Sequence, residues 1–335
     1  MRIVFLGNFT VDYSSETHHK KSLEALGHEV IALQETQATS EKVLEESMNS
    51  DMLVWVHTHG WATPGTLGMS AVLKFLKKAG VPTVTYHLDL WFGLRRQQDL
   101  EKDPIYKSIE YFFTCDKKMA DWFNAETDVK GVYLPAGVFQ DDMKLDLDAP
   151  KTRDIIFVGS KGYHPEWPYR PKLINWLKET YGARFTHVGG DGETGTIRGD
   201  ALTKLYNETK VVVGDSLVIG FDYPYYWSDR LYETAGRGGF QIFPQITGIQ
   251  DQYSTYDFKT DDAMFWDKAP APIELVTYEF DNFDMLKQRI DYYLEHDAER
   301  DEIRKNAYER TLKDHTYLVR WQTILDRVKE DKNNG

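Results

Sequence analysis

The most chemically capable short segment of this chain contains Ser228, Arg230 and Glu233. If the segment is a helix that Ser228 caps, Arg230 falls in its first turn and Glu233 lies three residues further on. A guanidinium at the start of a helix suits a diphosphate, and a carboxylate one turn later can accept hydrogen bonds from two ribose hydroxyls. The same spacing also fits an ordinary surface ion pair, so the segment alone leaves both interpretations open.

Two glycine-containing turns follow apolar runs and are candidate loops for binding an anionic ligand. Gly159 and Lys161 lie in the segment Gly-Ser-Lys-Gly, where small residues let the backbone approach an anion and the lysine can neutralise it. Gly7 and Asn8 follow the first apolar run of the chain. Neither segment is a P-loop or a G-x-G-x-x-G motif, so a plain turn between a strand and a helix is the alternative.

Acid–base chemistry has two candidates in the first half of the chain. Asp89 follows a β-branched run and could take a proton from a substrate hydroxyl; His18, early in the first expected helix, could help to orient that hydroxyl. A purely structural role is the alternative for each. His57 and His59 could form a metal-binding pair, but the sequence shows no convincing third ligand. No metal and no cofactor are therefore expected.

The elements that must position these residues alternate between short β-branched or aromatic runs and amphipathic stretches. This alternation is typical of a parallel, doubly wound α/β sheet. In such sheets ligands bind beyond the carboxyl ends of the strands, which is where most of the candidates lie. The expected strands are Arg2–Leu6, His28–Leu33, Met52–His57, Thr83–His87, Tyr111–Cys115, Val129–Leu134, Asp154–Val158, Phe185–Val188, Lys210–Gly214 and Phe240–Phe243.

Composition narrows the classes of protein that the chain can be. It has 335 residues and a net charge of −13, which both halves share, and this balance argues against non-specific nucleic-acid binding as the main activity. Cys115 is the only cysteine, so no intrachain disulfide or cysteine zinc cage is possible. No segment has the length and apolar character of a membrane span. Because the single cysteine suits a reducing compartment, we expect a cytoplasmic protein.

Several segments of the chain, in their order and spacing, resemble those of the spore-maturation-type (CgeB-like) branch of the GT-B glycosyltransferases. This branch includes phage members, and the expected compartment is the host cytoplasm if a phage encodes the chain. The resemblance covers most of the chain and is strongest in the second half. The matching phrases there are Asp154–Gly159, Phe185–Gly192, Ile197–Gly199, Leu205–Ser216, Ser228–Phe243 and Arg304–Leu325.

This resemblance implies a GT-B fold, in which two Rossmann-like domains face a central cleft. It implies an acceptor domain at 1–139, a linker at 140–152 and a nucleotide-sugar domain at 153–315. The last helix, 316–335, would cross back to the first domain. The implied activity is metal-independent transfer of a sugar from a nucleoside-diphosphate sugar, with UDP favoured, to an acceptor hydroxyl.

By position, the resemblance assigns Glu233 to the ribose-binding carboxylate, the second Glu of the E-x7-E motif, while Tyr225 replaces the first. It places Lys161 and Arg230 at the diphosphate, and Arg198 and Gly199 in the loop that reads the base. The acceptor stays open among a saccharide, a protein, a small molecule and a hydroxylated base in phage-type DNA. A sugar-nucleotide epimerase and a non-catalytic nucleotide-sugar-binding protein are the alternative functions.

Overall fold

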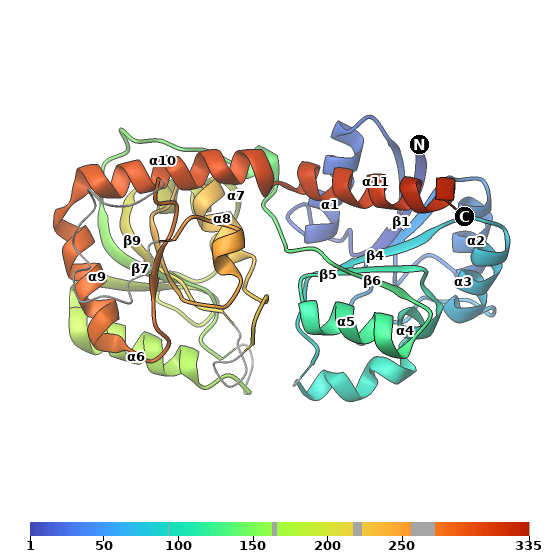
Figure 1. Cartoon of the computed structure of the whole chain (residues 1–335), viewed down its shortest axis with the longest axis horizontal. Helices are drawn as coiled ribbons and strands as arrows, with labels where there is room; N and C mark the ends of the chain where they lie inside the picture. The colour runs from blue at the N-terminus through green and yellow to red at the C-terminus, as the bar shows by residue number, and fades with distance from the viewer. Residues whose placement is uncertain (93, 163–165, 217–222, 256–271, 335) are drawn as a thin grey trace. The chain divides into compact units, whose positions relative to one another are not determined.

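The computed structural model describes residues 1–92, 94–162, 166–216, 223–255 and 272–334. They form two compact units. The first combines Met1–Phe139 with Tyr317–Gly335, and the second is Gln140–Thr316. Each unit is built on a parallel sheet that helices cover (Figure 1). The expected α/β class and the two Rossmann-like units are thereby confirmed.

The first unit contains a six-stranded parallel sheet in the order β2-β1-β3-β4-β5-β6. The chain first adds β2 on one side of β1 and then builds outward on the other side. The topological switch point therefore lies between β1 and β3, where ligands of such sheets bind at the carboxyl edge. The elements are β1 Arg2–Gly7, α1 Ser15–Ala25, β2 Glu29–Gln34, α2 Ser40–Met48, β3 Met52–Trp55, α3 Met69–Lys78, β4 Thr83–His87, α4 Pro104–Ser108, β5 Tyr111–Thr114, α5 Lys117–Glu126, β6 Lys130–Tyr133 and α11 Tyr317–Asn334.

Alternate residues of β1 enter two different hydrophobic cores. Ile3 and Phe5 pack into the core that α11 closes, whereas Val4 and Leu6 pack into the core on the other face of the sheet. Successive side chains of a strand point to opposite faces, so a strand buried on both faces needs an uninterrupted apolar run. This explains why the strands could be recognised in the sequence.

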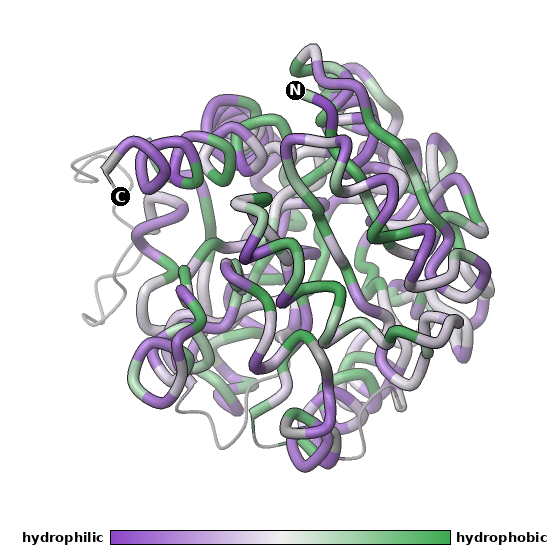
Figure 2. The backbone as a smooth tube through the Cα atoms, turned by 90° about the vertical axis from the view of Figure 1, so that its right-hand side faces the viewer, coloured by the Kyte–Doolittle hydropathy of each residue, from purple (hydrophilic) through white to green (hydrophobic). Residues whose placement is uncertain are grey.

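The last helix, α11, returns to the first unit and packs against α1 (Figure 1). In Figure 2 the helix that ends at the C-terminus alternates between hydrophilic and hydrophobic residues, as an amphipathic helix does. Its Trp321 is fully buried, and the indole Nε1 donates a hydrogen bond to His19 Nδ1 at 3.1 Å. Burial of His19 lowers its pKa to about 3, so the ring is neutral and can accept that bond. The expected return of the last helix is confirmed.

The second unit contains a five-stranded parallel sheet in the order β11-β10-β9-β7-β8. Its switch point lies between β7 and β9. The sequence did not predict β11, which has only three residues. The elements are β7 Arg153–Val158, α6 Tyr169–Tyr181, β8 Phe185–Val188, α7 Gly199–Asn207, β9 Thr209–Val213, α8 Arg230–Gly236, β10 Gln241–Pro244, β11 Val276–Tyr278, α9 Phe283–Glu295 and α10 Asp297–Asp314.

Residues 140–152, expected to be a linker, form part of the second unit. Asp142 forms an ion pair with Arg237, and the Lys151 ammonium donates to the carbonyl of Asn207 at 2.6 Å. The Asn207 side chain in turn accepts from the amide of Asp146 at 2.8 Å. Residues 140–152 are therefore held to the second unit by an acidic side chain, a basic side chain and a backbone amide.

Candidate functional site

Arg230 lies against Gly159 at the switch point of the second unit. A methyl group built on Gly159 would come within 3.3 Å of the Arg230 guanidinium carbon, so the absence of a side chain there makes room for the guanidinium. Gly159 also has a positive φ of 144°, which L side chains rarely adopt. Arg230 as a whole residue is partly exposed, and its Nη1 donates to Ser228 Oγ at 3.0 Å. A fixed cation thus lies beside the backbone that follows β7.

The helix that carries Arg230 is shorter than the sequence suggested. It begins at Arg230, with Asp229 rather than Ser228 at the N-cap position, and it has seven residues. Ser228 still contributes, because its hydroxyl accepts from the Arg230 amide at 3.3 Å. With so short a helix, the positive charge of the site comes mainly from the guanidinium rather than from the helix dipole.

Glu233 lies one turn beyond Arg230 and is partly exposed. Burial and the negative charge of Asp229 raise its pKa, while Arg237, Arg230 and Arg198 act against that rise. Within the described part of the chain, no side chain forms an ion pair with its carboxylate. The surface Arg–Glu pair considered from the spacing is therefore not formed, and the carboxylate oxygens remain able to accept hydrogen bonds from a ligand.

Lys161 is engaged differently from the expectation. Its ammonium donates to Asn175 Oδ1 at 2.6 Å, and the amides of Lys161 and Gly162 bind the carboxylate of Asp191. Burial opposes the charge on Asp191, but these amide hydrogen bonds hold its pKa below the usual value. The anion-binding amides expected in this turn are thus used by a side chain of the protein itself.

Arg198 and Gly199 lie at the start of α7. Arg198 is exposed and occupies the N-cap position, while Gly199 has a positive φ of 57°. The carbonyl of Gly199 accepts from Arg237 Nη1 at 3.1 Å. Gly159 thus lies against Arg230, and the charges of Arg198 and Arg230 both act on Glu233. Arg237, which the sequence analysis did not single out, secures the loop at Gly199.

At the carboxyl edge of the first unit, Gly7 and Asn8 shape the turn after β1. A side chain on Gly7 would lie 2.9 Å from Cγ of Glu16, so only glycine lets α1 come this close. The Asn8 side chain accepts from the amide and hydroxyl of Thr10, and the Asn8 carbonyl accepts from Ser14 Oγ at 2.8 Å. These contacts give both residues a structural role, and donor binding by them stays a prediction.

His18 and Asp89 occupy different environments in the same unit. The His18 ring stacks on Phe139, with centroids 4.3 Å apart, so its ring has a clear packing role. Asp89 is exposed in the loop after β4, and its negative charge acts on Glu16. Glu16, which the sequence analysis did not single out, is buried beside the turn at Gly7. Burial, with smaller contributions from Glu35 and Asp89, raises the pKa of Glu16 to about 7.

This raised pKa predicts a stability gain when Glu16 is replaced by Gln. The folded chain binds the Glu16 proton more tightly than the unfolded chain, whose carboxyl titrates near 4.5. Below pH 4.5 Glu16 is protonated in both the folded and the unfolded chain, and it does not lower the free energy of unfolding. As the pH rises from 4.5 through 7, Glu16 lowers the free energy of unfolding, because its charge is disfavoured in the folded chain. At pH 8 we expect Glu16→Gln to raise the free energy of unfolding by about 3 kcal/mol.

Chemical unfolding at pH 4 and pH 8 measures this gain. The exposed Glu24 of the same helix supplies the control, since Glu24→Gln should change the free energy of unfolding by under about 0.5 kcal/mol at both values. A Glu16→Gln gain that is equal at pH 4 and pH 8 would refute the shifted titration.

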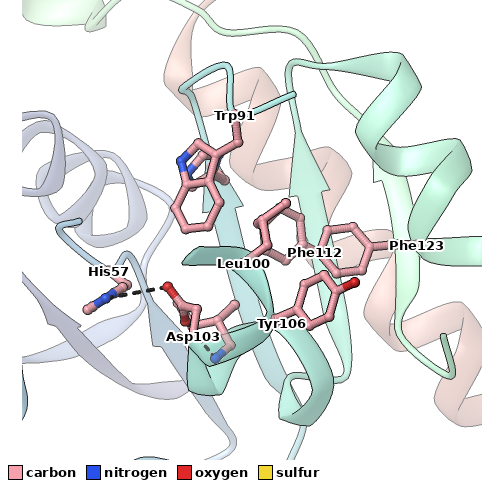
Figure 3. A pocket seen from close by; sticks show the side chains of 9 residues that line it. His57, Trp91, Leu100, Asp103, Tyr106, Phe112 and Phe123 are labelled. Carbon is pink, nitrogen blue, oxygen red and sulfur yellow. Dashed lines mark hydrogen bonds and ion pairs between the residues drawn. The ribbon is translucent and has the colours of Figure 1, made fainter. Parts of the chain in front are cut away.

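A further network involves Glu35, His57 and Asp103 at the end of β3. Buried Glu35 accepts from the Trp55 indole and from the amide of Thr58, both at 3.0 Å, and pairs closely with His57. Burial opposes the charge on His57, but the contact with Glu35 and the charge of Asp103 hold its pKa above the usual value. His57 Nε2 lies 3.5 Å from Asp103, which caps α4 (Figure 3).

The cavity beside this network is too small for a sugar. Aromatic and aliphatic side chains surround it, including Trp91, Tyr106 and Phe123 (Figure 3). Its free space admits about one water molecule. This cavity is therefore not a sugar site, and the Glu35–His57–Asp103 network links the ends of β2 and β3 to the start of α4.

Two properties concern metals and membranes. Over residues 1–92, 94–162, 166–216, 223–255 and 272–334, no cluster of three His, Cys, Asp or Glu side chains is arranged to hold a metal ion. None of the described helices has the length and apolar character needed to cross a lipid bilayer.

Comparison with known proteins gives a family model and a set of solved structures. Residues 170–326 match the model of a family described as glycosyl transferase-like. A search of curated protein sequences finds no match. The matched segment begins at α6 and includes Arg198, Arg230 and Glu233, so it covers most of the candidate site.

Several solved structures resemble the chain over nearly its whole length. Anabaena HepE in complex with UDP-glucose has a TM-score of 0.64 at 11% identity, and the match covers 98% of this chain and 100% of that one. An alpha-glucosyltransferase in complex with UDP and a mismatched 13-mer DNA has a TM-score of 0.61 at 14% identity, with the same coverage. Sucrose-phosphate synthase from Thermosynechococcus elongatus has 0.58 at 11%, with 99% and 100% covered. These likenesses show that the fold is GT-B.

Proposed function

We propose that this chain is a glycosyltransferase that moves a sugar from a UDP-sugar to an acceptor hydroxyl. The glycosyl transferase-like family model over residues 170–326 supports sugar transfer. The complexes of structural neighbours with UDP and UDP-glucose support a nucleotide-sugar donor. At 11–14% identity these neighbours support the fold alone. The argument for the donor therefore rests on the residues of the site itself.

The observation that carries the proposal is the placement of Arg230 and Glu233 at the switch point. The Arg230 guanidinium lies on the side-chain-free surface of Gly159, where a diphosphate can approach both the backbone and the cation. Glu233, one turn away, presents a carboxylate to the two ribose hydroxyls. In this proposal Arg230 stabilises the charge that develops on the departing diphosphate, and no metal ion is needed.

The first unit is proposed to bind the acceptor. Asp89 is exposed beyond the carboxyl end of β4, where it can take the acceptor proton if the reaction inverts the anomeric centre. A retaining reaction needs no such base. Asp89→Asn should therefore abolish transfer in the first case and leave most of it in the second, and the anomeric configuration of the product distinguishes the two.

The acceptor is proposed to be a saccharide, a protein, a small molecule or a hydroxylated base in DNA. The neighbouring alpha-glucosyltransferase was solved with DNA, which makes hydroxymethylated DNA a worthwhile acceptor to test. The proposed compartment is the cytoplasm, because the single cysteine requires no oxidising environment.

A donor and acceptor panel tests the function. The protein is incubated with UDP-glucose and other nucleotide sugars, with and without hydroxymethylated DNA or oligosaccharides, and products are identified by mass. We expect UDP release that an acceptor accelerates and that EDTA leaves unchanged. Isomerised donor without an acceptor would indicate an epimerase, donor binding without turnover a binding protein, and neither binding nor turnover would overturn the proposal.

A further inference from the structure

A buried ion pair between Arg170 and Asp215 contacts the loop that carries Gly159. Arg170, in the first turn of α6, donates from Nε to Asp215 Oδ2 at 2.9 Å, and Trp167 Nε1 donates to the same oxygen at 3.0 Å. Asp215 follows β9, and both members of the pair are almost completely buried. An ion pair in such a place costs desolvation energy, and nothing in the activity proposed above uses it.

The ion pair connects the loops on either side of the switch point. Arg170 Nη1 donates to the carbonyl of Ser160 at 3.1 Å, next to the glycine on which Arg230 rests. Ser216, the residue after Asp215, is fully buried. Its hydroxyl oxygen accepts a hydrogen bond from the backbone amide of Ser228 at 3.0 Å.

Ser228 completes the connection, because its hydroxyl accepts from Arg230 Nη1 at 3.0 Å. Asp215 and Arg230 are also coupled directly, since the Asp215 charge is among the negative charges that raise the pKa of Arg230 against the opposing effect of burial. A continuous path of hydrogen bonds and covalent bonds therefore runs from the loop after β7, through Arg170 and Asp215, to the guanidinium.

We propose that Arg170, Asp215 and Ser216 are positioning residues that hold the Arg230 guanidinium against Gly159 in the geometry that binds the donor diphosphate. This inference rests on the proposed function. None of the three touches the donor in this account; they act by fixing two loops and one cation before the ligand arrives. Such preorganisation lowers the cost of ordering the site on binding.

A double-mutant cycle on UDP affinity tests the proposal. Ser216→Ala removes the acceptor for the Ser228 amide without leaving a buried charge, and Arg230→Ala removes the cation. We expect Ser216→Ala to weaken UDP binding by roughly 5- to 10-fold in the wild-type chain and to have almost no further effect when Arg230 is already Ala. Asp215→Asn should show the same pattern, with a larger loss of UDP affinity in the wild-type chain.

A buried hydroxyl at the opposite end of β9 provides the matched control. Thr209 donates to the carbonyl of Leu205 at 2.7 Å, and Thr209→Val should leave UDP affinity within about 2-fold of wild type while lowering stability comparably. Equal losses from Ser216→Ala in both backgrounds would overturn the positioning role. Failure of the wild-type chain to bind UDP would instead overturn the proposed function.

Discussion

Arg230→Ala should weaken the binding of UDP by about 100-fold while leaving the affinity for uridine almost unchanged. In the proposed function the guanidinium gives the diphosphate charge-assisted hydrogen bonds, each worth roughly 1.5–3 kcal/mol in a partly buried site. Uridine has no phosphate, so its binding does not depend on these bonds. Calorimetric titration with UDP and with uridine measures both affinities. Equal weakening of the two ligands would mean that Arg230 contacts the nucleoside or only supports the fold.

Lys161→Ala is the control for that experiment. Both residues were expected at the diphosphate, but the Lys161 ammonium is bound to Asn175 and its amide to Asp191. We therefore expect a loss of UDP affinity below about 3-fold for Lys161→Ala, in the range of a surface substitution. A loss as large as that of Arg230→Ala would show that Lys161 leaves Asn175 to bind the phosphate.

His19 should make the docking of α11 sensitive to acid. Burial lowers its pKa from 6.5 to about 3, so the unfolded chain binds the proton more tightly than the folded chain. The neutral ring costs nothing above pH 6.5, and stability is lost as the pH falls from 6.5 towards 3. Between pH 7 and pH 4 we expect His19 alone to remove about 3 kcal/mol from the free energy of unfolding.

His19→Gln isolates this loss, because an amide oxygen can accept the Trp321 hydrogen bond but does not titrate in this range. Chemical unfolding of both proteins at pH 7 and pH 4 should show a smaller drop for the variant by that amount. Parallel drops would contradict the assignment. The other titrating groups contribute equally to the pH dependence of unfolding in both proteins, so the difference between the two proteins measures the effect of His19.

The sequence predicted the parts of the fold that depend on local pattern. Short β-branched or aromatic runs located ten of the strands in the sequence, each within a few residues of its observed bounds. They include β2 and β6, which are not fully buried. The amphipathic tail likewise indicated helices. β11 was not predicted because three residues are too few to establish a period. α4 was not predicted because it has only five residues and follows the charged segment Arg95–Lys102, which forms a 3₁₀ helix.

The site was predictable only in part. Arg230 and Glu233 lie on one helix, so their spacing in the sequence predicted that their side chains would lie near each other. By contrast, the backbone amide of Lys161 donates to Asp191, which lies thirty residues further along the chain. Arg170 and Asp215, which form an ion pair, are separated by forty-five residues. Local spacing cannot report such pairs, because they arise where loops after different strands converge. Glu16 was missed for the same reason, since its raised pKa comes from burial beside Gly7.

The most direct test of the account is the preference of the protein for a ribose diol. Wild-type protein should bind UDP about 10- to 100-fold more tightly than 2′,3′-dideoxy-UDP, because in the proposed function Glu233 accepts hydrogen bonds from both hydroxyls. Calorimetry on Glu233→Ala should show nearly equal affinities for the two ligands. If the variant keeps the wild-type preference, or if the wild type has none, the second unit does not hold a nucleotide in the way described.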